Sequence, residues 1–283
     1  MKTQLYGSIA GILFLGTILT GCQTGTKKNT ENDIRFNTLK VDETYHLMNN
    51  PDYPNCNLQL SFTYPNKYDN SKVLEKIQKL FVSSYFGEAY EEYNPEEAVK
   101  QYTEDYLAMY KELEEYYTDE LKNADETAVG SWYSYYETSS NEIVFNMDGL
   151  LSQVVSFESY TGGAHGEHSV INKVINLESG EYVTEEEVFV DNFESSLAQI
   201  LIDKIAEKNE LTDSKELENI GYFSIDEIYP NGNFYVDEEG ITYTFNEYEI
   251  AAYVVGITQV KVPYIKIKHL LRKESPIYKL VEN

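Results

Sequence analysis

Apolar and polar residues alternate along the first patterned segment of the chain, and the period then lengthens. Over residues 57–64, apolar side chains occupy every second position, which predicts a half-buried strand. After Asn70, apolar residues recur at intervals of three and four up to Gly87, as in an amphipathic helix with a capping residue at each end. The pattern therefore predicts a strand followed by a helix.

A second helix is predicted to begin at Asn94, which can cap it, with Pro95 at the first helical position. Apolar and tyrosine residues, Tyr106 among them, keep helical spacing as far as Leu121. The segment is also strongly acidic, since residues 85–126 contain 14 Asp and Glu against three Lys. The sequence thus predicts a helix with a negatively charged outer face.

Two interpretations of this acidic helix remain open. Tyrosine and carboxylate side chains together suit the docking of a basic protein, and the candidate contact residues are Tyr106, Glu112, Glu115 and Asp119. Alternatively, the tyrosines form the core face of the helix, and the acids only solvate its outer face. The spacing of the residues does not separate the two interpretations.

From Ser131 onward the period of two returns, and turn residues separate the strand-like runs. These runs cover residues 132–136, 142–147, 153–160, 170–177, 234–236, 241–245 and 259–262. The turns include Ser-Ser-Asn and Asp-Gly, and a helix is predicted from about Phe193. Because strands and helices are segregated instead of alternating, we predict the α+β class, with two consecutive small units, mostly antiparallel sheets and packed helices.

One loop between two predicted strands is rich in glycine. Its sequence is Tyr160-Thr161-Gly162-Gly163-Ala164-His165-Gly166. Glycine tolerates positive φ angles and close backbone approach, so Gly162 and Gly163 are predicted to shape the loop. Tyr160 and His165 are its candidate binding residues.

Candidate chemistry is sparse in the chain. His165 and His168 flank Glu167, but no third ligand follows at a recognisable spacing, so we predict neither a metal site nor a cofactor. The sequence has no Gly-x-Ser-x-Gly elbow for a serine nucleophile, and its 48 acids make chance carboxylate pairs common. We therefore predict no catalytic residue and expect a protein that is not an enzyme.

The N-terminus resembles a bacterial lipoprotein signal peptide. Lys2 precedes an apolar run from Ser8 to Leu19, which is shorter than the roughly 20 residues that span a bilayer. The Leu-Thr-Gly-Cys sequence ending at Cys22 is similar to a lipobox, which implies cleavage before Cys22 and lipidation of its sulfur. Two or more acyl chains anchor a protein stably, so we expect a membrane-tethered protein that faces outside the cytoplasm. The alternative is cleavage elsewhere, with Cys22 an ordinary signal-region residue.

The net charge of the chain limits the kinds of partner that it can bind. Acids outnumber Lys and Arg by 48 to 22, and the net charge of −26 repels nucleic acid and attracts cationic proteins. An apolar content of 42% supports a folded core and excludes a wholly disordered chain.

The only cysteine beside Cys22 is Cys56, so no intramolecular disulfide is predicted. No neighbouring Cys or His lowers the pKa of Cys56, and we expect it to be buried and inert.

Several motifs resemble a family of extracytoplasmic domains found in the anti-sigma-V factor RsiV and at the N-terminus of the peptidoglycan deacetylase PdaC. They lie at residues 159–166, 175–180, 187–189 and 245–271. The resemblance covers about residues 51–273, and it implies two α+β units with lysozyme as a ligand. The chain shows neither the sigma-binding segment nor the deacetylase catalytic domain, so neither activity is expected.

These patterns divide the chain into five segments. They are the lipoprotein signal peptide (1–21), a flexible tether (22–50), an N-terminal α+β unit (51–168), a C-terminal α+β unit similar to RsiV (169–275) and a tail (276–283). The predicted function is that of a lipid-anchored binding module of the bacterial cell envelope, which captures a basic protein such as lysozyme. The alternatives are a peptidoglycan- or glycan-binding module, supported by the 26 tyrosines, and an envelope hydrolase.

Overall fold

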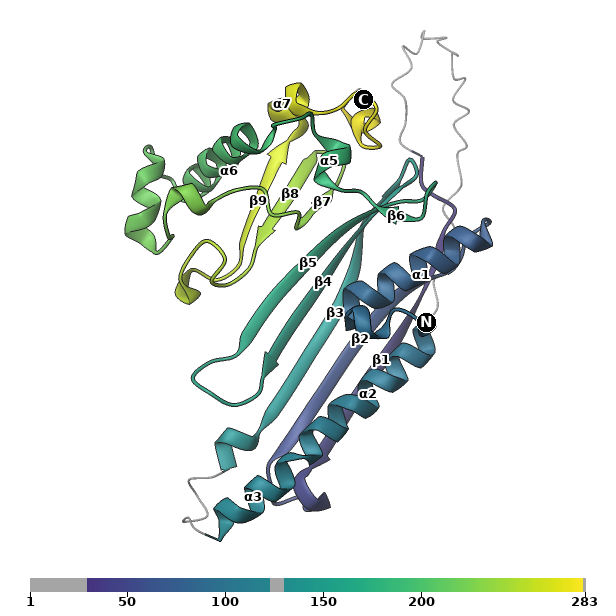
Figure 1. Cartoon of the computed structure of the whole chain (residues 1–283), viewed down its shortest axis with the longest axis vertical. Coiled ribbons are helices and arrows are strands. Elements are labelled where there is room, and N and C mark those ends of the chain that lie inside the picture. Colours follow the sequence, from purple (N-terminus) through teal and green to yellow (C-terminus); the bar gives the residue numbers. More distant parts are fainter. Residues whose placement is uncertain (1–29, 123–129, 282–283) are drawn as a thin grey trace, which may run out of the picture.

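A six-stranded sheet forms the centre of the structure (Figure 1), a computed structural model that describes residues 30–122 and 130–281. Its strands are β1 (Arg35–His46), β2 (Asn55–Lys67), β3 (Tyr135–Met147), β4 (Leu150–Tyr160), β5 (Glu167–Asn176) and β6 (Glu181–Tyr182). They lie side by side in sequence order. All neighbouring strands are antiparallel except β2 and β3, which are parallel and need a long crossover between them.

The crossover between β2 and β3 supplies helices that cover one face of this sheet (Figure 1). They are α1 (Ser71–Phe86), α2 (Pro95–Lys111) and α3 (Leu113–Leu121). Asn70 caps α1 by accepting a hydrogen bond from the Val73 amide, and Asn94 caps α2 in the same way. Alternate apolar residues of β2 and the inner faces of the helices bury one core.

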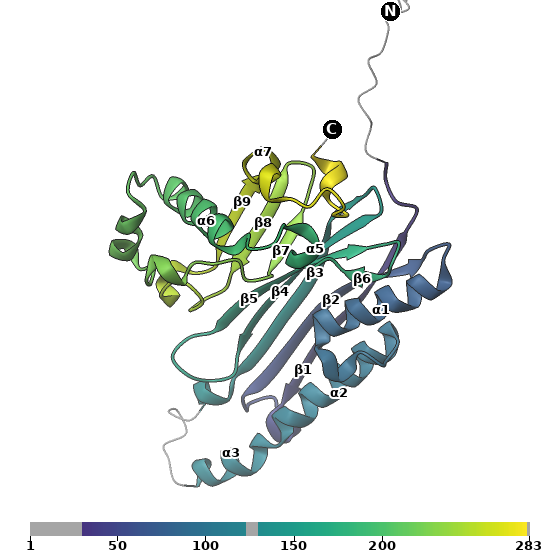
Figure 2. The same ribbon diagram turned by 45° about the horizontal axis from the view of Figure 1, so that its top comes forward.

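The second unit packs against the other face of the six-stranded sheet (Figures 1 and 2). Its antiparallel sheet contains β7 (Phe234–Val236), β8 (Gly240–Phe245) and β9 (Thr258–Pro263), and its helices are α5 (Glu185–Val188), α6 (Glu194–Lys208) and α7 (Tyr264–Ile267). Its core also includes Phe145, Leu150 and Val174 from the first sheet. The predicted α+β class with two units and mostly antiparallel sheets is confirmed.

Buried hydrogen bonds fix the position of one sheet on the other. Ser152 Oγ on β4 donates to the Val236 carbonyl oxygen on β7 at 2.7 Å. Asn172 Nδ2 on β5 donates to Thr244 Oγ1 on β8, also at 2.7 Å. Sliding the sheets would leave these buried groups without partners, so the hydrogen bonds specify one register between the units.

Residues 35–46 form strand β1, so the predicted tether over residues 22–50 is wrong for this part. Each residue of β1 pairs with β2, but β1 lies at the edge of the sheet, and most of its side chains are exposed. An exposed edge strand carries little apolar alternation, and the sequence pattern therefore misses it.

The structure also differs from three other predictions, which concern a turn, the boundary between the units and the tail. The Ser-Ser-Asn segment lies inside β3 and is no turn, because Asn141 is buried and its side chain donates to the Thr63 carbonyl oxygen at 2.7 Å. Strand β5 begins at Glu167, so the first sheet continues past the boundary predicted at residue 168. Ile277 and Leu280 are buried in the second core, so the described part of the predicted tail is folded.

Candidate functional site

The hairpin between β4 and β5 brings the glycine-rich loop to the junction of the two units. Gly162 has a φ of +85° and Gly163 a φ of +113°. A Cβ on Gly162 would lie 2.8 Å from the Trp132 carbonyl oxygen, whereas a Cβ on Gly163 would meet nothing within 4 Å. The Tyr160 hydroxyl donates to the Gly163 carbonyl oxygen at 2.9 Å. Backbone conformation and close approach thus both favour glycine at position 162.

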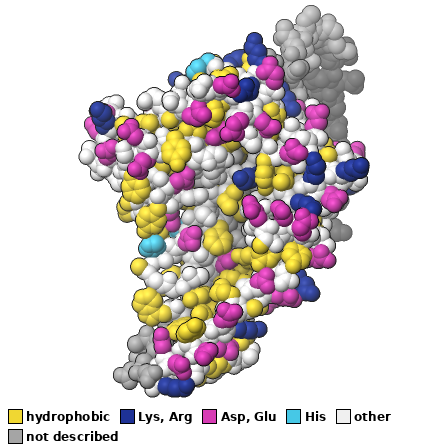
Figure 3. Space-filling view, viewed as in Figure 1, with side chains coloured by type: hydrophobic (Ala, Val, Ile, Leu, Met, Phe, Trp, Pro, Cys, Tyr) yellow, Lys and Arg dark blue, Asp and Glu magenta, His cyan; other side chains and the backbone are white. Residues whose placement is uncertain are grey.

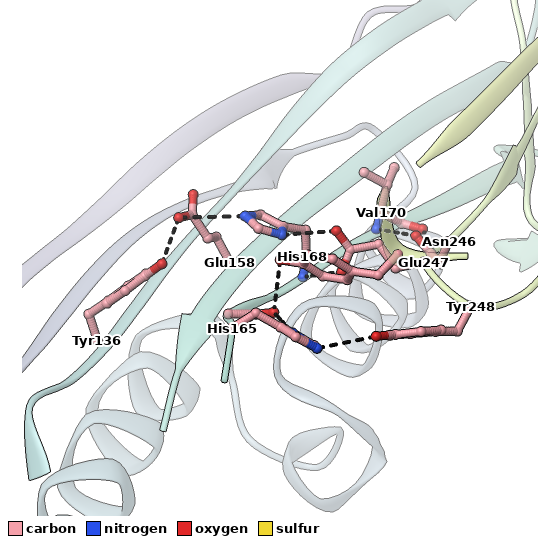
Figure 4. A network of polar contacts seen from close by, with 10 residues as sticks. Tyr136, Glu158, His165, His168, Val170, Asn246, Glu247 and Tyr248 are labelled. Carbon is pink, nitrogen blue, oxygen red and sulfur yellow. Dashed lines mark hydrogen bonds and ion pairs between the residues drawn. The ribbon is translucent and has the colours of Figure 1, made fainter. Parts of the chain in front are cut away.

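His165 connects this loop to the second unit. Its ring stacks on Tyr253, with centroids 4.0 Å apart and planes at 26°. Its Nε2 lies 3.2 Å from the Tyr248 hydroxyl oxygen, and its Nδ1 lies 2.8 Å from the Gly166 carbonyl oxygen (Figure 4). Although His165 is exposed, stacking and hydrogen bonding fix its ring at the rim of the junction.

A chain of polar contacts lies beside this rim (Figure 4). The Tyr136 hydroxyl donates to Glu158 Oε1 at 2.8 Å, and His168 Nε2 lies 3.7 Å from the same oxygen. On its other side, His168 Nδ1 lies 3.1 Å from Glu247 Oε1. Asn246 Oδ1 accepts a hydrogen bond from the Val170 amide at 2.8 Å. The chain therefore joins three strands of the first sheet to the 246–248 segment of the second unit.

His168, Asn246 and Glu247 line a cavity of about 370 Å³, together with His165 and Tyr248 at its rim. The described residues around it offer imidazole, carboxylate, amide and hydroxyl groups, and none is Lys or Arg. The cavity can accept and donate hydrogen bonds, and its charge favours neutral or cationic groups. Within residues 30–122 and 130–281, no three or more His, Cys, Asp or Glu are placed to hold a metal ion.

Only part of this site could be predicted from the sequence. Tyr160 and His165 were predicted as binding residues, and the structure places both at the junction. Glu247, Tyr248 and Tyr253 entered the prediction only through the C-terminal motif. Their meeting with the hairpin depends on how the two units pack, and no local pattern encodes that.

The predicted acidic face lies on α2 and α3, the helices that cover one face of the first sheet. Glu112, Glu115 and Asp119 are all exposed, and Asp119 forms an ion pair with Lys122 at 2.9 Å. Among the described residues, neither Glu112 nor Glu115 has an ion-pair partner. Figure 3 shows acidic side chains between apolar ones at the lower end of the molecule, where α3 lies.

The prediction that Tyr106 is a binding residue of this acidic face is wrong. Its side chain is 7% exposed and belongs to the core between α2 and the sheet. Helical spacing placed it on the same helix as the acids, but its inward direction follows from packing. For this tyrosine, the alternative interpretation as a core residue is the correct one.

The titratable side chains of Glu137 and Cys56 are buried beneath the helices. Glu137 on β3 accepts a hydrogen bond from the Tyr102 hydroxyl at 2.8 Å, and burial raises the pKa of this carboxyl above its ordinary value. Burial also raises the pKa of the Cys56 thiol to about 11, which keeps it protonated at neutral pH. The structure thus confirms the prediction that Cys56 is buried.

Family models match each of the two units separately, and solved structures match both units together. A family model described as "Deacetylase PdaC" matches residues 52–168, and one described as "Protein of unknown function (DUF3298)" matches residues 186–265. The crystal structure of a DUF3298 family member from Bacteroides fragilis NCTC 9343 has 31% sequence identity and a TM-score of 0.83, over 90% of this chain and 100% of that one. The chain belongs to the DUF3298 family.

A DUF3298 family protein from Pseudomonas aeruginosa PAO1 has the same fold at 13% identity, with a TM-score of 0.56 over 85% of this chain and 96% of that one. The search among curated proteins gave no match. The family assignment confirms the resemblance inferred from the sequence motifs. In this DUF3298 protein, the glycine-rich loop lies near the end of the first matched segment and Glu247 lies within the second, so the polar junction joins the two matched units.

Proposed function

We propose that this protein is a lipid-anchored binding module of the bacterial cell envelope that captures a basic protein such as lysozyme. The exposed acidic end of α2 and α3 carries the proposal, because Glu112 and Glu115 lack counter-ions among the described residues. Carboxylates without counter-ions attract cationic partners over distances of about 10 Å at 0.1 M ionic strength. The net charge of −26 acts in the same direction.

The proposed anchor is Cys22, which lies outside the described residues together with the rest of the signal sequence. No helix in the described part of the chain is long and apolar enough to cross a membrane. The lipobox-like sequence supports lipidation, and export with a lipid anchor would put the acidic face outside the cytoplasm. The proposal is one of binding, and it assigns no catalytic residue.

Charge reversal tests the capture of a basic protein. The triple variant Glu112→Lys, Glu115→Lys and Asp119→Lys should lower the association rate for lysozyme at least tenfold at low salt, with a smaller change in dissociation. Surface plasmon resonance at two salt concentrations measures both rates. In the wild type, raising the salt from 0.05 M to 0.5 M should slow association, because screening shortens the reach of the acids.

A matched control separates local charge from net charge. Reversal of Glu216, Glu227 and Glu238 to Lys changes the total charge equally, but these exposed residues lie in the second unit. The control should retain most of the association rate. Absence of lysozyme binding by the wild type, or equal effects of the two triple variants, would contradict capture through α2 and α3.

A further inference from the structure

A second cavity lies where α3 meets the glycine-rich loop, on the helix-covered face of the sheet. Its volume is about 660 Å³, and we call it the aromatic pocket. Its side-chain walls are Leu113, Tyr116, Glu120, Trp132, Tyr133 and Tyr135, and residues 161–163 of the loop close it. Four of these six side chains are aromatic, and the only charged side chain in the described lining is a carboxylate.

Two of the aromatic side chains are unusually exposed. Trp132 is 60% exposed and Tyr116 is 67% exposed, whereas most tyrosines on these helices pack into the core. Exposed aromatic residues around a hollow mark contact sites, because they bury a large area when a partner covers them. The pocket therefore has the character of a binding site.

The deeper walls of the aromatic pocket are held in place before any ligand arrives. Tyr133 packs edge-on against Tyr117 with centroids 5.2 Å apart, and Tyr135 packs against Tyr110 at 5.3 Å. Gly162 allows the loop to approach the Trp132 carbonyl oxygen more closely than any side chain would permit. A preformed site loses little conformational freedom on binding.

The charge of the pocket selects the ligand. Burial and a hydrogen bond to Glu120 raise the pKa of Tyr133, so its phenol stays neutral and the Glu120 carboxylate supplies the negative charge beside the aromatic rings. Glu115 and Asp119 lie on the same helix. Aromatic faces and a carboxylate attract cations and repel anionic glycans.

We propose that the aromatic pocket binds a Lys or Arg side chain of the basic protein partner. This inference rests on the proposed function and locates the contact that follows electrostatic encounter. The exposed acids steer the partner, and the pocket then holds one cationic side chain between Trp132 and Tyr116, next to Glu120. Arg gains more from the aromatic walls than Lys, since its planar guanidinium stacks on rings.

Trp132 is the single tryptophan of the chain, so its fluorescence reports on this pocket directly. The full chain is titrated with hexa-arginine and hexa-lysine peptides, which contain no tryptophan, and with the neutral trisaccharide of N-acetylglucosamine. We expect a saturable change of Trp132 emission with the peptides, stronger with hexa-arginine, and none with the trisaccharide. Tyr116→Ala should weaken peptide binding about 2- to 30-fold, and Glu120→Gln should also weaken it.

Tyr229→Ala is the matched control, because Tyr229 is 60% exposed but lies in the second unit. It should leave the titration unchanged, and the far-ultraviolet circular dichroism of all variants should match that of the wild type. Emission that responds only to the trisaccharide, or peptide affinity that is unchanged in Tyr116→Ala, would overturn the inference. Lysozyme capture without any effect of the peptides on Trp132 would refute the pocket and leave the proposed function standing. A peptide response without lysozyme capture would support the pocket and refute lysozyme as the partner.

Discussion

Glu247 holds His168 with both of its carboxylate oxygens. Oε1 lies 3.1 Å from His168 Nδ1, and Oε2 accepts a hydrogen bond from the His168 backbone amide at 3.3 Å. Glu247 belongs to the second unit and His168 to the hairpin of the first sheet, so this pair links the two units beside the polar cavity. The side chain of Glu247 is only 11% exposed, and water therefore competes weakly for these bonds.

Replacing Glu247 by Ala should loosen this junction. Loss of both bonds should lower the free energy of unfolding by about 2 kcal/mol, because hydrogen bonds to a charged group contribute more than neutral ones. The amides of residues 165–168 should exchange hydrogen faster, since Glu247 no longer fastens the hairpin. Urea unfolding and hydrogen-exchange mass spectrometry measure the two effects. The exposed Glu238→Ala is the control, and equal behaviour of the two variants would argue against the link.

The two loop glycines should respond differently to alanine. Gly163→Ala should lower the free energy of unfolding by about 1 kcal/mol, which is the penalty for an L side chain at positive φ. No steric penalty is added, because the new Cβ would meet nothing within 4 Å. Gly162→Ala should cost more, since its Cβ would lie 2.8 Å from the Trp132 carbonyl oxygen and would force the loop away. The exposed His165→Ala should cost less than Gly162→Ala. Denaturant midpoints rank the three, and the reverse order would make the histidine the main structural element.

Glu137 should make stability depend on pH. Burial raises the pKa of this carboxyl in the folded state above its value of about 4.3 in the unfolded chain. The stability linked to its proton is therefore fully present below the unfolded pKa, and it is lost as the pH rises through the folded pKa. The Glu137→Gln side chain stays neutral at every pH and can still accept a hydrogen bond from the Tyr102 hydroxyl. The free energy of unfolding of this variant, measured relative to that of the wild type, should therefore be higher at pH 7 than at pH 4.

Urea unfolding of both proteins at the two pH values gives this difference directly. The exposed Glu238→Gln provides the control, for which the difference between variant and wild type should change little with pH. A Glu137→Gln variant whose relative stability is the same at pH 4 and pH 7 would show that burial does not penalise the charged carboxylate.

Cys22→Ala should release the protein from membranes. The described part of the chain contains no helix able to span a bilayer, so the predicted acyl chains are the proposed means of attachment. Cell fractionation with a carbonate wash compares this variant with Cys56→Ala, which should stay in the membrane fraction. Retention of Cys22→Ala after the wash would refute the lipoprotein prediction.

The sequence by itself determined the features that depend on near neighbours. A capping residue was predicted at the start of the helix after Asn70, and Asn94 was predicted to cap the next helix; in the structure Asn70 caps α1 and Asn94 caps α2. The runs at residues 142–147, 153–160 and 170–177 were predicted as strands from the period of two, and they lie in β3, β4 and β5. These elements could be predicted because the hydrogen bonds and the periodic burial that define them involve residues close together in the chain.

Only the tertiary structure decided which distant surfaces meet. Strand β1 exists because the edge of β2 offers free backbone groups, and its own side chains carry little pattern. Asn141 is buried because Thr63 satisfies its amide from a neighbouring strand, which no local propensity for turns reveals. The contact of Glu247 with His168 spans 79 residues, and the aromatic pocket joins α3 to a loop about 40 residues further along the chain. Both sites are products of packing between elements, where side-chain direction and partner geometry are set by contacts absent from any local stretch of sequence.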